Sequence, residues 1–290
     1  MPALPMLSRR RLLAAAGALL VATRVRAAAG RVLVLGGDLV EIAFALGAGG
    51  AVIATDETAL WPPEAEALPK VGYLRQLSAE GILSLAPDLV LASPDAGPPA
   101  VMEQLRAAGL AVEVGPAGTG FAAVAPKISF VGKALGREAE AGALAARVAA
   151  EMAAVEAALA AVPDTPSVVF LISVGRGAPM AAGSGTAADA MIRLAHARNA
   201  VAGFEGYKPL SAEAAVGLAP DALLLPEHAV DAAGGAERAL ALSGLANTPA
   251  GREGRVVVMD GLKLLGFGPR TPAAVAELAR ALHPDAPLDL

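Results

Sequence analysis

The stretch Ser78-Ala-Glu-Gly-Ile-Leu-Ser-Leu-Ala-Pro-Asp-Leu-Val-Leu91 recurs 133 residues later as Ser211-Ala-Glu-Ala-Ala-Val-Gly-Leu-Ala-Pro-Asp-Ala-Leu-Leu224, with eight of the fourteen positions identical. In each copy a serine suited to cap a helix precedes a short helical segment, and a Pro-Asp pair then introduces an aliphatic strand. Two copies are too few for a solenoid, which needs at least about three. The repeat therefore predicts two similar lobes, although a shared habit of capping a helix before a strand could explain part of the match.

Aliphatic strands alternate with helices on both sides of a long alanine-rich segment. Strands are predicted at 31–36, 51–54, 88–92 and 111–114, and again at 167–172, 221–225 and 255–259. Such alternation is typical of a parallel α/β sheet. After the first strand, Asp38 is predicted to cap a helix, with Glu41 at capping-box spacing.

The alanine-rich segment 121–162 is predicted to join the two halves. It has only Pro126 as an internal proline, so we expect one helix of about 35 residues, roughly 50 Å long. Its heptad pattern is too poor for a coiled coil. The expected fold class is α/β, with two parallel-sheet lobes, residues 30–120 and 163–290, joined by one long α-helix and a ligand cleft between the lobes.

The first 29 residues have the pattern of an export signal. Three arginines, Arg9 to Arg11, precede an apolar run and a small-residue end at Ala27–Ala29. The run is too short for a bilayer, which takes about 20 residues, and arginines beside Leu-Leu resemble a twin-arginine signal, although a general secretory route stays open. We expect cleavage near Ala27–Ala29 and a periplasmic location; an amphipathic anchor helix is disfavoured because the segment has no acidic face. The rest of the chain has 18 basic and 28 acidic side chains, a net charge of −10.

The composition excludes several kinds of site. The chain has no cysteine, which rules out disulfides, zinc ribbons and cysteine nucleophiles, and it has only three histidines. Its acidic balance argues against a nucleic-acid partner. Gly183-Ser184-Gly185 lacks the flanking glycines of a nucleophile elbow, so we expect no enzyme. With no cysteine and few histidines, a metal in this chain would be bound by oxygen atoms.

The chain has only two tyrosines, and each has a cation close by in the sequence, in the loop before a repeated helix. Arg75 follows Tyr73 by two positions, and Lys208 is next to Tyr207. A neighbouring positive charge favours the phenolate, which is a known axial ligand of haem iron. The cations could instead pair with carboxylates of a ligand, and both tyrosines could simply pack beneath a loop with their hydroxyls in water. Spacing alone leaves these alternatives open.

Five blocks of the sequence belong together: Gly36-Gly-Asp38, Leu68-Pro-Lys-Val-Gly-Tyr-Leu-Arg75, Ala178-Pro-Met-Ala-Ala-Gly183, Gly206-Tyr-Lys-Pro-Leu-Ser-Ala-Glu213 and Gly268-Pro-Arg-Thr-Pro272. In these blocks the chain resembles the periplasmic haem-binding proteins of bacterial haem ABC importers. The resemblance implies two α/β lobes on one connecting helix, with haem b held in the cleft as a transported ligand. It also implies that Tyr73 is the axial ligand of the iron, and that Arg75 stabilises the phenolate or meets a haem propionate.

The resemblance implies partners as well. In this class of proteins a glutamate on the repeated helix of each lobe docks onto arginines of the membrane permease, and Glu80 and Glu213 occupy these positions. Each is also simply a favourable acid in a first helical turn. We therefore expect an ABC permease–ATPase complex as partner, an outer-membrane haem receptor system upstream, and a monomeric binding protein.

One departure from the family concerns the second side of the haem. Some relatives carry a histidine after the first strand of the second lobe, where this chain reads Ser173-Val-Gly-Arg-Gly177. Arg176 is therefore a candidate propionate contact, and the open face of the iron is left to water, to Tyr207 or to apolar cover. Tyr207 and Lys208 complete the predicted pocket. A ferric siderophore or a cobalamin is the alternative cargo of the same fold.

Overall fold

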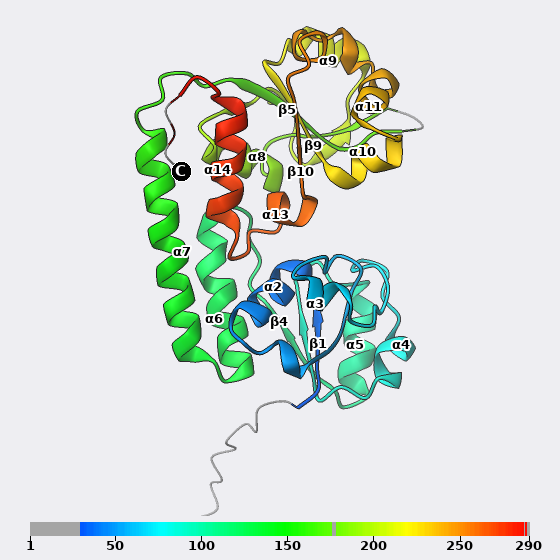
Figure 1. Ribbon diagram of the computed structural model, residues 1–290. Helices are drawn as coiled ribbons and strands as arrows, with labels where there is room; N and C mark the ends of the chain where they lie inside the picture. The colour runs from blue at the N-terminus through cyan, green and yellow to red at the C-terminus, as the bar shows by residue number, and fades with distance from the viewer. Residues whose placement is uncertain (1–29, 176–177, 287, 289–290) are drawn as a thin grey trace, which may run out of the picture.

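The computed structural model describes residues 30–175, 178–286 and 288. It shows two α/β lobes, one above the other, with two long helices along one side (Figure 1). The export signal predicted for residues 1–29 and the candidate Arg176 lie outside the described residues. Within the described part, no helix has the length and apolar character needed to cross a membrane.

The N-terminal lobe is built on a four-stranded parallel sheet in the order β2-β1-β3-β4. Its strands are β1 (Val32–Leu35), β2 (Val52–Thr55), β3 (Leu89–Ala92) and β4 (Ala111–Val114). The helices that connect them are α2 (Gly37–Ala45), α3 (Pro63–Glu66), α4 (Ala79–Ser84) and α5 (Pro99–Ala107). All four predicted strands are confirmed, and their carboxyl ends share one edge of the sheet because they run parallel.

The C-terminal lobe contains a mixed sheet in the order β10-β9-β5-β6-β8, with β7 paired to β5. Its strands are β5 (Ser167–Ser173), β6 (Met180–Ala182), β7 (Arg198–Asn199), β8 (Tyr207–Pro209), β9 (Ala222–Pro226) and β10 (Val256–Met259). Its helices are α8 (Ala187–Leu194), α9 (Ala212–Leu218), α10 (Glu227–Ala233), α11 (Ala236–Ser243), α12 (Pro249–Arg252), α13 (Gly261–Leu265) and α14 (Thr271–Leu282).

The second sheet is therefore only partly parallel. Strands β5, β9 and β10 run parallel, as predicted, whereas β6 and β8 are antiparallel. The connection from β5 to β6, residues 174–179, is much shorter than the dozen residues that a parallel crossover needs, so these neighbours have to be antiparallel. The two-lobed α/β fold class is as expected, and the antiparallel pairing of β5 with β6 was not predicted.

The segment 121–162 forms two packed helices, α6 (Val124–Leu135) and α7 (Glu138–Leu159), and the prediction of one helix over its whole length is wrong (Figure 1). The chain turns at Gly136, whose φ of +66° is left-handed and suits glycine at the end of a helix. A Cβ on Gly132 would lie 2.4 Å from the Cβ of Ala141, so small residues let the helices approach closely. The helix that connects the lobes is α7, of 22 residues.

The two copies of the sequence repeat form the same structure in the two lobes. Each gives a short helix, α4 or α9, followed by a buried strand, β3 or β9. Asp88 accepts a hydrogen bond from the backbone N–H of Arg31, just before β1. Asp221 accepts the equivalent bond from the backbone N–H of Ser167, at the start of β5. The shared aspartate thus ties its own strand to the first strand of its lobe.

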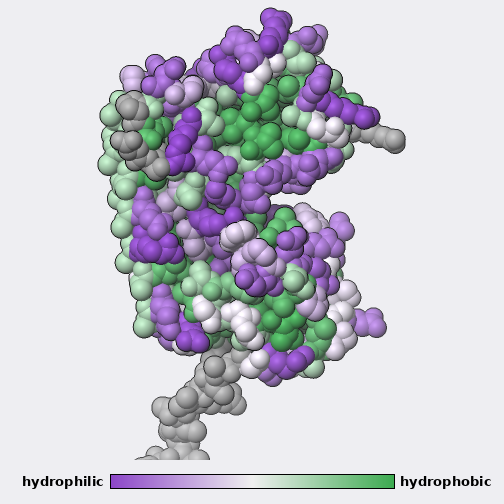
Figure 2. All heavy atoms as spheres, in the orientation of Figure 1, coloured by the Kyte–Doolittle hydropathy of each residue, from purple (hydrophilic) through white to green (hydrophobic). Residues whose placement is uncertain are grey.

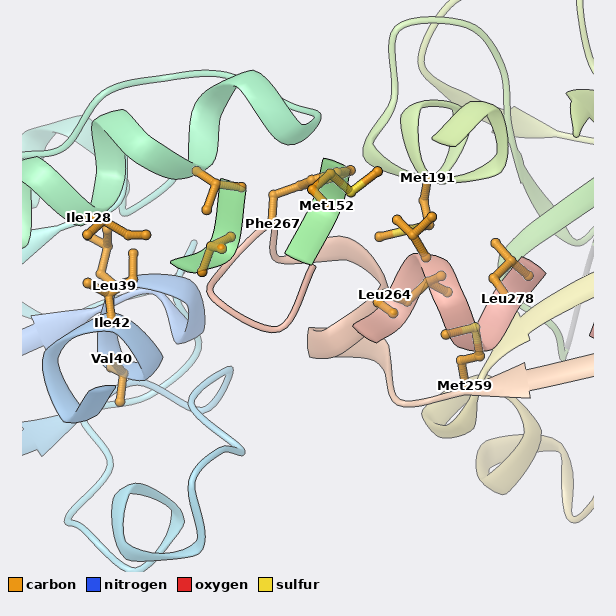
Figure 3. Packing of buried hydrophobic residues seen from close by; sticks show 14 of the residues in the cluster. Leu39, Val40, Ile42, Ile128, Met152, Met191, Met259, Leu264, Phe267 and Leu278 are labelled. Atoms are coloured by element: carbon orange, nitrogen blue, oxygen red, sulfur yellow. The ribbon is translucent and has the colours of Figure 1, made fainter. Parts of the chain in front are cut away.

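One hydrophobic core runs through both lobes and the two long helices (Figure 3). It includes Ile42 of α2, Ile128 of α6, Met152 of α7 and Leu278 of α14, all at most 1% exposed. Two smaller cores lie within the N-terminal and the C-terminal lobe. The lobes are therefore packed onto a common apolar centre.

A buried ion pair connects α2 with α6. The Lys127 Nζ lies 2.7 Å from Asp38 Oδ2, and the side chains are 8% and 13% exposed. Lys127 also donates to the carbonyl oxygen of Gly266, after α13, at 3.0 Å. This ammonium group therefore links α2 and α6 to the residue at the end of α13.

A second buried pair connects α2 with the start of α14. Glu41 accepts hydrogen bonds from the backbone N–H of Arg270 at 3.0 Å and from its Nε at 2.9 Å. Burial raises the pKa of Glu41, and Arg270 offsets this only in part. The predicted capping box of Asp38 and Glu41 is wrong, because both carboxylates pair with distant cations and the helix is capped by Gly36.

Candidate functional site

A cleft opens between the two lobes on the side away from α6 and α7 (Figure 2). The carboxyl ends of β1 and β10 point toward it (Figure 1). The segments that follow these strands meet at its base, since a Cβ on Gly37 would lie 2.7 Å from the Cδ1 of Leu262 in α13. Ligands of open α/β sheets bind at this edge, outside the carboxyl ends of the strands.

The loop of residues 69–77 carries Tyr73 and is anchored to β2. The backbone N–H of Val71 donates to the carbonyl oxygen of Thr55 at 2.9 Å, and the Lys70 Nζ donates to the Thr55 hydroxyl at 2.9 Å. Burial lowers the pKa of Lys70. Leu74 is buried, whereas Tyr73 remains 40% exposed. The fixed loop therefore presents the Tyr73 ring on the surface.

Tyr73, Arg75 and Asp95 form a chain of polar contacts. The Arg75 Nη1 donates to the Tyr73 hydroxyl oxygen at 3.1 Å, and Nη2 donates to Asp95 Oδ2 at 2.7 Å. Partial burial alone would lower the pKa of Arg75, but Tyr73 and Asp95 outweigh burial and raise it. A guanidinium group is thus fixed on the phenol oxygen of Tyr73.

Tyr207 lies on β8 and is partly buried. Its hydroxyl interacts with the backbone N–H of Ala188 and the side chain of Thr186, at the start of α8. Burial raises the pKa of Tyr207, and these contacts and the charge of Arg75 lower it by less. The charge of Arg75, in the N-terminal lobe, is thus one of the causes that act on Tyr207, in the C-terminal lobe. Among the residues that the structure describes, a cation is hydrogen-bonded to the hydroxyl of Tyr73 but not to that of Tyr207.

Three of the four remaining predicted site residues are described, and they are exposed. Glu80 and Glu213 are exposed in the first turns of α4 and α9. The exposed Lys208 lies with its Nζ 5.4 Å from the centroid of the Phe204 ring, on the same strand as Tyr207. Arg176 is outside the described residues. Across the described part of the chain, no group of three or more histidines, aspartates or glutamates is placed to hold a metal ion.

Sequence reasoning missed Asp95. It follows β3, twenty positions after Arg75, and no helical or strand spacing relates the two. The available signal was topological: the residues after β2 and β3 lie at the same edge of a parallel sheet. A search for carboxylates at that edge would have found Asp95.

Two solved haem-binding proteins have a similar structure. The periplasmic haem-binding protein RhuT from Roseiflexus sp. RS-1, in apo form, has a TM-score of 0.84 and 43% identity over 89% of this chain and 99% of that chain. The periplasmic haem-binding protein BhuT, in complex with two haems, has a TM-score of 0.81 and 47% identity over 87% of this chain and 97% of that chain.

Curated relatives extend the comparison. YvrC of Bacillus subtilis (strain 168), an uncharacterized ABC transporter substrate-binding lipoprotein, is 30% identical over 249 residues, which is 84% of this chain and 77% of the relative. The vitamin B12-binding protein of Vibrio cholerae is 36% identical over 82 residues, which is 28% of this chain and 30% of that protein.

Two α/β lobes on a long connecting helix, with a cleft at the carboxyl ends of their strands, define a two-lobed substrate-binding protein. Residues 32–261 match the model of the periplasmic binding protein family. The chain belongs to this family, and it is a transport component rather than an enzyme.

Proposed function

We propose that this protein binds haem in the cleft between its lobes, with Tyr73 as the axial ligand of the iron, and delivers it to an ABC permease–ATPase complex. The observation that carries the proposal is the hydrogen bond from Arg75 to the exposed Tyr73 hydroxyl at 3.1 Å. The positive charge favours the phenolate, and a phenolate is an axial ligand of haem iron. The similarity to RhuT and BhuT supports haem b as the transported ligand.

Asp95 acts as a positioning residue for Arg75. Its carboxylate holds Nη2 at 2.7 Å while Nη1 faces Tyr73. A guanidinium group has five N–H donors in a fixed fork, so Arg75 can hold the phenolate and meet a propionate at the same time. The three side chains therefore form one unit in which Tyr73 binds the metal and Arg75 stabilises charge.

Tyr207 and Lys208 are assigned to the opposite wall of the cleft. The raised pKa of Tyr207 keeps its hydroxyl protonated, so we assign this side chain to packing or hydrogen bonding against the haem rather than to the iron. Lys208 is exposed on the same strand and is suited to a propionate carboxylate. Arg176 remains a proposed propionate contact.

The cellular setting follows from the same proposal. We infer that the chain has a twin-arginine-like signal at 1–29, cleaved near Ala27–Ala29, and that it works as a monomer in the periplasm. An outer-membrane haem receptor system would supply the ligand. The proposed units are an N-terminal lobe at 30–120, a connecting segment at 121–162 and a C-terminal lobe at 163–290. Similarity to an ABC transporter substrate-binding lipoprotein supports the transporter partner.

Hemin titration followed by visible absorption tests the proposal. The wild-type protein is expected to give the spectrum of a ferric haem bound by tyrosinate. Tyr73→Phe keeps the ring and removes the ligand oxygen, so the tyrosinate bands should vanish and affinity should fall by at least about tenfold, or 1.4 kcal/mol. Tyr207→Phe is the matched control and should keep the bands. An unchanged spectrum in Tyr73→Phe would overturn the ligand assignment.

A cobalamin is the second candidate ligand, because the match to a vitamin B12-binding protein covers part of the chain; a ferric siderophore is the third. A thermal-shift panel with hemin, cobalamin and ferric siderophores separates them. A ligand at about 100 times its Kd stabilises the folded state by about 2.7 kcal/mol. Stabilisation by cobalamin or a siderophore, and none by hemin, would replace haem with that ligand.

A further inference from the structure

The repeated helices carry exposed aliphatic side chains at equivalent positions. Leu83 on α4 and Val216 on α9 are 133 positions apart, the offset of the repeat, and each is 39% exposed. Each follows the exposed glutamate of its helix by three positions, Glu80 or Glu213. Residues three apart lie on one face of a helix, so each lobe pairs a carboxylate with an aliphatic group on its surface.

Within each of the two helices, the residues around the pair are small where they are exposed, and none carries a positive charge. The other exposed positions of the two helices are small residues: Gly81 and Ser84 on α4, and Ala212, Ala214 and Gly217 on α9. Neither helix contains lysine or arginine. In the described ranges, neither Glu80 nor Glu213 has an ion-pair partner within the chain. Both carboxylates are therefore available to an external cation.

We propose that Leu83 and Val216 join Glu80 and Glu213 in a two-part docking surface for the permease. The inference rests on the proposed function and adds a chemical requirement to it: each of two similar permease halves presents a cation beside an apolar pocket. Burying the aliphatic group excludes water around the neighbouring ion pair, which strengthens that pair. A two-fold dimer through this surface is disfavoured, because it would bring the carboxylates of one copy against those of the other.

Binding to the ABC permease–ATPase complex of the same bacterium, held in lipid nanodiscs, tests the surface. Leu83→Ser and Val216→Ser are each expected to weaken binding by about tenfold, and the double variant by about a hundredfold. Val258→Ser is the matched control, because Val258 is 37% exposed on β10, outside the repeat, and binding should not change. Leu83 and Val216 are each 39% exposed and are not among the residues assigned to the haem pocket, so the unfolding temperature should fall only slightly and the hemin spectrum should keep its wild-type form.

Two readouts distinguish the outcomes. Wild-type affinity in the double variant would overturn the docking surface, and so would a wild-type dimer in solution that the double variant abolishes. If hemin fails to bind but the chain still docks through these residues, the cargo assignment fails and the surface stands. If hemin binds and the affinity for the permease–ATPase complex does not depend on Leu83 and Val216, the docking surface is refuted and the proposed function stands.

Discussion

Replacing Asp38 by asparagine is expected to destabilise the protein far more than replacing Glu151 by glutamine, although each change neutralises one carboxylate of an ion pair. Asp38 and Lys127 are 13% and 8% exposed, whereas Glu151 and its partner Arg147 are 44% and 57% exposed. Removing one partner of a buried pair leaves the other charge uncompensated, at a cost of about 3–5 kcal/mol. An exposed pair contributes at most about 1 kcal/mol.

The structure places Asp38→Asn near the lower end of this range. The Lys127 ammonium keeps the carbonyl oxygen of Gly266 at 3.0 Å, and the new amide oxygen still accepts a hydrogen bond. We therefore expect a loss of about 3 kcal/mol. For a chain of this size each kcal/mol shifts Tm by roughly 2–4 °C, so the fall should be roughly 6–12 °C.

Urea unfolding followed by circular dichroism at neutral pH measures the effect. The double variant Asp38→Asn, Lys127→Met should lose less than Asp38→Asn alone, because no buried charge is left without its partner. The reasoning is refuted if Asp38→Asn costs no more than Glu151→Gln, or if the double variant is as unstable as the sum of its single changes.

Three further predictions concern the ligand site and the effect of pH. Asp95→Ala should release Arg75 and reduce haem affinity by about fivefold, since the pair is more than half exposed, while the tyrosinate bands of the hemin spectrum persist; loss of those bands would contradict a positioning role. Hydrogen bonds from Ser167 hold the pKa of Asp221 below its ordinary value. The ionised Asp221 therefore stabilises the fold fully at neutral pH, and this stabilisation is lost as pH falls through the folded-state pKa. In urea titrations, the difference in free energy of unfolding between wild type and Asp221→Asn should narrow below about pH 4. The contribution of Glu41 to stability depends on pH in the opposite direction, because burial raises the pKa of this carboxyl group. Its stabilising contribution is present at low pH and is lost as pH rises through the folded-state pKa, so the stability of wild type relative to Glu41→Gln should fall between acidic and neutral pH; a gap that widens in favour of wild type would contradict this sign.

The sequence repeat predicted the two lobes because its identical aspartates, Asp88 and Asp221, make equivalent contacts in the two lobes. Ser211 caps α9 through its side chain, and Asp88 and Asp221 bond the backbone of a neighbouring strand in the same lobe. The capping bond is local, whereas each aspartate reaches back 57 or 54 positions to the start of the first strand of its own lobe. The proximity of a cation to Tyr73 was likewise visible, because Arg75 is two positions away in a short loop.

The features that escaped prediction are tertiary. Asp38 and Glu41 have capping-box spacing, but their partners are Lys127 and Arg270, which lie far along the chain. Local spacing cannot reveal that a distant cation competes for a carboxylate. The turn at Gly136 was missed because glycine is tolerated inside an alanine-rich helix, so composition alone does not show which glycine of this segment ends α6.

The hydrophobic core shared by the two lobes limits how the protein can release its ligand. Since apolar side chains of both lobes pack onto the same centre, spreading the lobes exposes them to water. Exposing even about 200 Å² costs about 5 kcal/mol, well above thermal energy. Wide opening requires work from outside the molecule, and a transporter driven by ATP is able to supply it.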